Sequence, residues 1–307
     1  MSKQRFSTLV FAFTLLLSAF SAWAADLVRH TVDSDGHAIA VWEKSPAAPQ
    51  ALMLLIHGRT WSTLPDFDLQ VAGEDLSLMD GLVALNIATY GVDLRGYGAT
   101  PRAASGWLTP NQAVRDVTTV LQWLRQRHPH LARPHLFGWS NGSMVAQLVV
   151  QKHPELVSSV ILFGYPVRRD VDFGARLPDE PPREPTTAQA AASDFITPGT
   201  ISDAAIAAFV ASALSADPVR VDWRSLEQWR ALSAPAVTVP TLLLEAEFDP
   251  LALDDVHADF FANLATNDKA WVVIPGGDHA AFMETPRGYF LRSIDSFVFR
   301  GAGPPQP

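Results

Sequence analysis

The chain has no cysteine among its 307 residues. This absence excludes a disulfide framework, a thiolate metal site, a lipid-modified N-terminal cysteine and a cysteine nucleophile. Internal repeats, a glycine-rich phosphate-binding loop and clusters of metal-ligating side chains are also lacking, and the one short biased segment is the closing "GAGPPQP". We therefore expect a packed domain that uses no metal ion and no organic cofactor.

Basic residues are scarce, with 23 Lys and Arg against 32 Asp and Glu, a formal net charge of −9. Such a chain is a poor candidate for binding nucleic acid or anionic lipid. Its hydrophobic content of 48% and charged content of 18% are typical of a globular core and not of disorder. Composition therefore predicts a globular protein with a small-molecule partner; it does not indicate the oligomeric state.

One apolar run differs from the others because it lies at the N-terminus. Lys3 and Arg5 precede "STLVFAFTLLLSAF", and the small residues Ala22 and Ala24 follow it. A basic start, a short apolar middle and an A-x-A exit are typical of a secretory signal peptide, whereas a membrane anchor, the alternative, needs a longer run. We expect residues 1–24 to be removed, leaving an exported protein, periplasmic or secreted, without stable membrane insertion.

Strand-like and helix-like segments alternate along the rest of the chain. Runs such as "ALMLLIHG" and "PHLFGW" are continuously apolar, which indicates strands buried on both faces. Thr109 and Pro110 form a helix start, and "NGSMVAQLVVQKH" reads as a helix. The pattern predicts an α/β fold, with a mostly parallel twisted sheet and helices on both faces.

The alternation is interrupted between residues 167 and 235. Proline, charge and short alanine-rich helices replace strands there, as in "PDEPPREPTTAQ", "SDAAIAAFVASAL" and "DWRSLEQWRAL". We interpret residues 167–235 as a helical lid insertion. The predicted core then comprises residues 25–166 and 236–300, followed by a flexible tail, 301–307.

A serine between two glycines marks the candidate catalytic centre. Gly138-Trp139-Ser140-Asn141-Gly142 matches G-x-S-x-G, placed between a predicted strand and a predicted helix as a nucleophile elbow requires. The sharp turn exposes the serine hydroxyl, and the helix directs its positive end at the site. Ser140 is the predicted nucleophile.

A serine nucleophile needs a histidine base and a carboxylate that orients it. Of nine histidines, His279 alone lies on a glycine-rich loop after the last predicted strand, in "VIPGGDHAAFME". Asp249 follows the strand "TLLLEAEF" and is the predicted acid, with Glu247 as its rival. Asp278 is too close in sequence to reach the ring of its neighbour.

The oxyanion of the reaction needs two backbone donors. We predict the N–H of Asn141, directly after the nucleophile, and the N–H of Arg59, in the loop after "LMLLIHG". The Arg59 side chain could bind a substrate carboxylate, a structural acid or solvent. Four tryptophans are candidates either for lining an apolar pocket or for packing: Trp61, Trp107, Trp223 and Trp229.

Five patterns in order make the mature chain resemble a lidded serine hydrolase of the α/β-hydrolase superfamily, similar to esterases and lipases. They are "HGRTW", "DLRGYG", "GWSNG", "LLLEAEFDP" and "GGDHAAFMETP". The resemblance implies an oxyanion donor in the first pattern, a structural turn at Asp93–Gly98, and nucleophile, acid and base in the last three. Glu247 departs from the family, where many members have glycine.

The resemblance implies a serine hydrolase that cleaves a carboxylic ester through an acyl-enzyme. A proline-type aminopeptidase, another acyl hydrolase or an acyltransferase of the same fold is an alternative. For an aminopeptidase, the lid acids Asp179, Glu180 and Glu184 are candidates for binding an amino group. A non-catalytic ligand-binding protein on the same scaffold is the third possibility, against which the intact Ser140, Asp249 and His279 argue.

Overall fold

The computed structural model describes residues 25–166, 178–251 and 254–301. The predicted signal peptide lies outside these residues, as do residues 167–177 of the predicted lid and 302–307 of the predicted tail. Among the described helices, none combines the length and the apolar character that crossing a bilayer requires.

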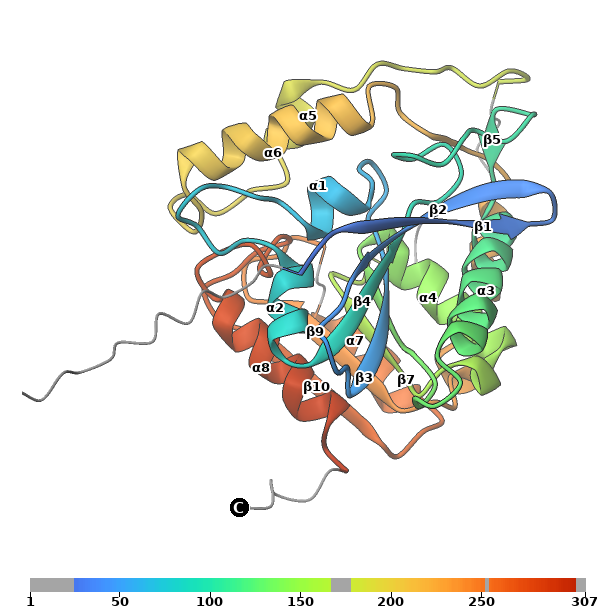
Figure 1. Cartoon of the computed structure of the whole chain (residues 1–307), viewed down its shortest axis with the longest axis vertical. Coiled ribbons are helices and arrows are strands. Elements are labelled where there is room, and N and C mark those ends of the chain that lie inside the picture. Colours follow the sequence, from blue (N-terminus) through green and yellow to red (C-terminus); the bar gives the residue numbers. More distant parts are fainter. Residues whose placement is uncertain (1–24, 167–177, 252–253, 302–307) are drawn as a thin grey trace, which may run out of the picture.

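An eight-stranded sheet forms the centre of the molecule, with strand order β1-β2-β4-β3-β6-β7-β9-β10 (Figure 1). From β4 to β10 all neighbours are parallel, whereas β2 is antiparallel to both β1 and β4. The predicted mostly parallel sheet is therefore confirmed. Its strands are β1 (Val28–Ser34), β2 (His37–Lys44), β3 (Ala51–Ile56), β4 (Ile87–Val92), β6 (His135–Trp139), β7 (Ser159–Phe163), β9 (Thr241–Ala246) and β10 (Lys269–Ile274).

Helices cover both faces of this sheet. Every residue of β3, β4, β6, β7 and β9 is buried, as expected where a parallel sheet lies between two helical layers. The helices are α1 (Thr63–Phe67), α2 (Leu78–Ala84), α3 (Pro110–Arg127), α4 (Asn141–Lys152), α5 (Ala188–Ala192), α6 (Asp203–Ala216), α7 (Asp254–Asn263) and α8 (Arg287–Val298). Helix α3 begins with the expected cap, since Thr109 Oγ1 accepts from Gln112 N and Gln112 Oε1 accepts from Thr109 N.

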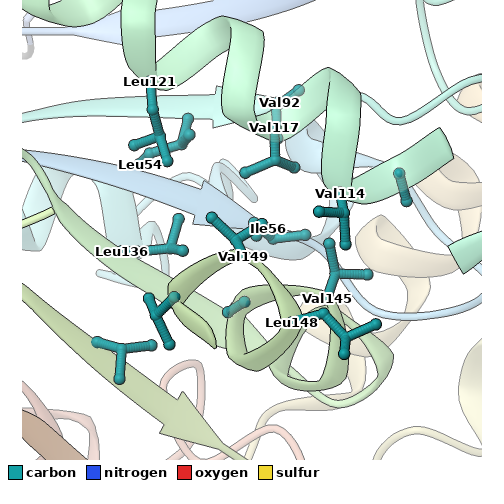
Figure 2. Close-up of a cluster of buried hydrophobic side chains, with 14 of the residues drawn as sticks. Leu54, Ile56, Val92, Val114, Val117, Leu121, Leu136, Val145, Leu148 and Val149 are labelled. Atoms are coloured by element: carbon teal, nitrogen blue, oxygen red, sulfur yellow. The ribbon is translucent and has the colours of Figure 1, made fainter. Parts of the chain in front are cut away.

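The two faces carry separate apolar clusters. On one face α3 and α4 pack against β3, β4 and β6 through the branched side chains labelled in Figure 2, among them Leu54, Ile56 and Val149. On the other face α1, α2 and α8 contribute buried residues such as Phe67 and Phe290. The alternation of side chains along each strand sends neighbours such as Leu54 and Leu55 into different clusters.

The segment between β7 and β9 departs from the predicted run of helices. It carries α5 and α6, and α6 packs on α1 at the top of the view in Figure 1. Residues 222–231, however, form the short strand β8 (Asp222–Trp223), paired in parallel with β5 (Trp107–Leu108), and then a 3-10 helix, Leu226–Ala231. Ser225 has φ = 56°, a left-handed conformation that prevents a continuous α-helix here. Two further 3-10 helices span Pro154–Leu156 and Ala234–Ala236.

Candidate active site

Ser140 lies at a strained turn between β6 and α4. Its φ of 54° and ψ of −123° are rare for a residue with a side chain and carry a cost of about 1–3 kcal/mol. Neighbouring bonds hold the turn: Ser140 N donates to Phe163 O at 2.9 Å, and Ser143 Oγ donates to Gly138 O at 2.7 Å. Ser140 is partly exposed after five buried residues of β6, so its hydroxyl is accessible from the end of the sheet.

The glycines on either side of Ser140 have a steric reason. A Cβ on Gly138 would lie 2.4 Å from Gly142 O, and a Cβ on Gly142 would lie 2.3 Å from Ile56 O. Real carbon atoms do not approach backbone oxygen so closely. The strand, the helix and β3 can therefore meet at this turn only because both positions lack a side chain.

The predicted base and acid meet although 30 positions separate them in the chain. His279 Nδ1 and Asp249 Oδ2 are 2.8 Å apart, and both residues are buried. Gly164, which follows β7, makes room for the pair: a Cβ there would lie 2.9 Å from His279 Nδ1 and 3.3 Å from Asp249 Oδ2. The carbonyl of Phe163, the residue before it, accepts from Ser140 N.

Trp139 connects the serine turn with the histidine loop. Its Nε1 donates to His279 O at 2.7 Å, and its ring centroid lies 5.3 Å from that of His279. Between Ser140 and His279, both described residues, no hydrogen bond is formed in this structure. The sequence analysis assigned no function to Trp139; only its place inside the G-x-S-x-G pattern marked it.

The other candidate acids lie elsewhere. Glu247 is exposed and accepts from Gly276 N at 2.9 Å, so its carboxylate supports the glycine-rich loop. Asp278 turns away from the His279 ring and accepts from Ile196 N and Thr197 N. Glu245 is buried in β9, where His257 Nδ1 lies 2.7 Å from its carboxylate. Asp249 is therefore the acid that the fold brings to His279.

Both predicted oxyanion donors have free backbone N–H groups. Asn141 is the first residue of α4, where an N–H has no partner within the helix, and neither Asn141 N nor Arg59 N meets an acceptor among the described residues. A Cβ on Gly58 would lie 3.7 Å from Ser140 Cβ, so the Gly58–Arg59 loop lies beside the nucleophile. Asn141 Nδ2 is a further buried donor without an acceptor.

Two buried side chains, His57 and Asp66, shape this loop. His57 Nδ1 lies 2.8 Å from Gly58 O, and its Nε2 accepts from Leu94 N at 3.1 Å. Burial lowers the pKa of His57, which keeps the ring neutral and suited to this bridging role. Asp66 Oδ2 accepts from Gly58 N at 3.2 Å, and burial raises the pKa of Asp66. No pattern in "LPDFDL" pointed to Asp66.

The "DLRGYG" turn has the structural role that the resemblance implied. Asp93 accepts from Trp42 Nε1, Thr63 N and Ala99 N. Arg95 pairs with the fully buried Asp116 at 2.7 Å. The loop is thus held from several elements, and neither side chain is free for catalysis.

The four candidate tryptophans are all buried. Trp223 lies 5.9 Å from Trp229 between ring centroids, and Arg224 lies over the ring of Trp107. Trp61 is different, because its Nε1 donates at 2.8 Å to Asp194, from the segment after α5. Burial raises the pKa of Asp194 to about 6, and the nearby His279 acts in the opposite direction. The other acids proposed for binding an amino group, Asp179, Glu180 and Glu184, are exposed.

A family described as "Serine aminopeptidase, S33" matches residues 47–180. No curated protein sequence matches significantly.

Many solved structures share the fold. An E-2-(acetamidomethylene)succinate hydrolase aligns with TM-score 0.63 and 20% identity over 89% of this chain and 99% of its own. A serine hydrolase involved in carbazole degradation aligns with TM-score 0.61 and 18% identity, over 89% of this chain and 99% of its own. An epoxide hydrolase from Vigna radiata aligns with TM-score 0.58 and 17% identity, over 89% of this chain and 98% of its own.

Proposed function

Since the chain has the α/β-hydrolase fold and is similar to a serine aminopeptidase family over residues 47–180, we propose that it is a serine hydrolase that cleaves a carboxylic ester through an acyl-enzyme. The observation that carries this proposal is the 2.8 Å contact between His279 Nδ1 and Asp249 Oδ2, beside a serine held at φ = 54°. His257 and Glu245 also form a buried histidine–carboxylate pair, so the strained serine next to the His279–Asp249 pair is what points to catalysis. Fold alone would not suffice, because members of this fold carry out varied reactions.

The chemistry proceeds in two halves. In the first half, Ser140 Oγ attacks the ester carbonyl, His279 Nε2 takes the hydroxyl proton, and Asp249 holds the imidazole tautomer and stabilises the imidazolium. The proton then passes to the departing alcohol, which leaves the acyl group on Ser140. In the second half, water gives its proton to His279, attacks the acyl carbon and releases the carboxylic acid.

Backbone donors stabilise the negative charge on the carbonyl oxygen. The N–H groups of Arg59 and Asn141 adjoin Ser140, and an oxyanion donor contributes about 3 kcal/mol to the transition state. The N-terminus of α4 adds the positive end of the helix dipole. The missing Ser140–His279 bond does not oppose this mechanism, because such bonds often form only with substrate bound.

Labelling of the folded protein with a fluorophosphonate tests the proposal. We expect one label, on Ser140, together with hydrolysis of p-nitrophenyl esters; Ser140→Ala should lose both, with turnover falling at least about 1000-fold. Ser296→Ala, at an exposed position of α8, is the matched control and should behave as the parent protein. A folded protein without label at Ser140 would contradict the proposal and favour the ligand-binding alternative.

A second candidate is an aminopeptidase, favoured by the family match over residues 47–180. Asp194 could bind a substrate amino group, since its carboxylate lies beside Trp61 and interacts with His279. Aminoacyl anilides with a free amine separate the two reactions. Preference for these anilides over esters would replace the esterase assignment and leave the roles of Ser140, Asp249 and His279 unchanged.

A further inference from the structure

Arg59 and Arg220 are exposed arginines that have no partner in the part of the chain that the structure describes. Neither guanidinium has a hydrogen bond, an ion pair or a ring contact among the described residues. In this acidic chain many other cations do have partners: Lys44 contacts two aspartates, and Arg95 and Arg287 each pair with one. Other exposed arginines, such as Arg230, also lack a partner among the described residues, but Arg59 and Arg220 lie near each other, and this needs an explanation.

The two arginines are close enough to act on each other and on Tyr97. Tyr97 and Arg220 both influence the pKa of Arg59, and burial raises the pKa of Tyr97, which both arginines lower. The Tyr97 hydroxyl donates to Arg59 O and accepts from Trp223 Nε1 at 2.8 Å. Trp223 belongs to β8, which starts two residues after Arg220, so Tyr97 links the two main-chain segments that carry the arginines.

The main chain of Arg220 is held on both sides. Its N–H donates to Glu184 O at 2.8 Å, and its carbonyl accepts from Arg102 Nη2 at 2.9 Å. Arg102 is itself paired with Asp222. Of the acids near this segment, Asp222 pairs with Arg102, and Asp217 accepts from Ser62 N and Gly98 N. The Arg220 guanidinium has no partner among the described residues and lies near a second positive charge, Arg59.

Arg59 belongs to the loop that faces the nucleophile. Gly58, the preceding residue, lies beside Ser140, and Arg59 N–H is one of the proposed oxyanion donors. The side chain is exposed to water, yet desolvation lowers the pKa of Arg59. The exposed side chain of Arg59 thus belongs to the loop that borders Ser140.

We propose that Arg59 and Arg220 form an anion subsite, and that the acyl part of the substrate carries a carboxylate. The substrate class is then the monoesters of dicarboxylic acids. This inference rests on the proposed function, since it specifies the substrate of the same site. Guanidinium groups suit carboxylates because their planar donors match two oxygens, and an anion between them removes the repulsion of two like charges.

Two esters of matched length test the inference: p-nitrophenyl hydrogen glutarate, with a free carboxylate, and neutral p-nitrophenyl pentanoate. We expect a higher kcat/KM for the acidic ester, and a preference that weakens as salt screens the charges. Arg220→Gln should lower the ratio of the two kcat/KM values about 10- to 100-fold, and Arg59→Gln should lower it likewise. Arg230→Gln, which removes another exposed, partnerless arginine, is the control and should keep the ratio.

The outcomes separate this inference from the proposed function. Hydrolysis of both esters with an unchanged ratio in Arg220→Gln and Arg59→Gln would overturn the subsite and leave the hydrolase intact. If neither ester is hydrolysed, the proposed function fails, and glutarate itself then tests the subsite. A rise in melting temperature with glutarate that Arg220→Gln abolishes would support anion binding, and no rise in the parent protein would overturn it.

Discussion

At the scale of single residues, the site depends on where side chains are missing. Gly164 has φ = 57° and lies against the His279 ring and the Asp249 carboxylate. Gly164 directly follows Phe163, the last residue of β7, whose carbonyl accepts from Ser140 N. It therefore lies between the serine turn and the His279–Asp249 pair. One backbone position therefore sets the distance between the nucleophile and its base.

Gly164→Ala should lower kcat strongly. The added Cβ would lie 2.8 Å from His279 Cε1, so the ring must shift, and displacement of about 1 Å at a reacting group can cost about 100-fold in rate. The measurement is kcat for p-nitrophenyl ester hydrolysis.

Gly199→Ala is the matched control for this substitution. Gly199 also has a positive φ, 84°, but a Cβ there meets nothing within 4 Å. The control bears a similar backbone penalty without the clash and should keep its kcat. An equal loss in both variants would show that backbone strain, and not displacement of His279, is responsible.

At the scale of elements, two carboxyl groups connect the histidine loop to the segment after α5. Asp278 accepts from Ile196 N at 2.9 Å and from Thr197 N, and Glu284 accepts from Thr200 Oγ1 at 2.8 Å. Glu284 also accepts from Asp278 N at 2.8 Å. Burial raises the pKa of Glu284 to about 8, and its neighbour Asp278 adds to that rise. Glu284 is therefore the group in this connection whose ionisation is displaced toward neutral pH.

The free energy of unfolding should fall as pH rises from about 4.5 to about 8. In that window the folded state binds a proton at Glu284 that the unfolded state has released, so the stabilising contribution is complete below about pH 4.5 and lost above about 8. Urea unfolding at several pH values measures the slope of the free energy of unfolding against pH. Glu284→Gln should make it shallower, because the amide cannot ionise.

Glu180→Gln is the control, since it makes the same chemical change at an exposed position. It should keep the slope of the parent protein. A Glu284→Gln protein with the parent's slope would show that Glu284 is ionised in the folded state at neutral pH.

At the scale of the whole molecule, stability comes from two apolar layers on a shared sheet. Leu54 is fully buried in β3, within the cluster that Figure 2 shows beneath α3 and α4. The neighbouring strands β4 and β6 hydrogen-bond to β3 on either side, which leaves it little freedom to collapse around a lost side chain.

Leu54→Ala should lower the free energy of unfolding by about 2–5 kcal/mol, through lost burial and the cavity left behind. Leu27→Ala makes the same chemical change at a side chain that is 39% exposed. It should alter the free energy of unfolding by less than about 0.5 kcal/mol. Urea unfolding of both variants decides the comparison. Similar small effects would mean that the sheet closes around the deletion.

Much of this architecture could be predicted from the sequence because its signals are local. A continuous apolar run such as "ALMLLI" needs cover on both faces, and a Thr-Pro pair followed by Gln112 starts a helix without distant partners. The signal of the glycine-serine-glycine turn is also local, because a Cβ on Gly138 would clash with Gly142, four residues away in the chain. The α/β class, the parallel sheet and the candidate nucleophile follow from such signals alone.

Only the tertiary structure decided which distant groups meet. The sequence left Glu247 open beside Asp249, and the fold directs one to Gly276 and the other to His279. The sequence left the partner of the Arg59 side chain open and did not mark Arg220, because whether a guanidinium group has a partner among the described residues depends on its three-dimensional surroundings. Hydrogen bonds and ion pairs act over a few ångströms in space, and their partners here lie tens of residues apart along the chain.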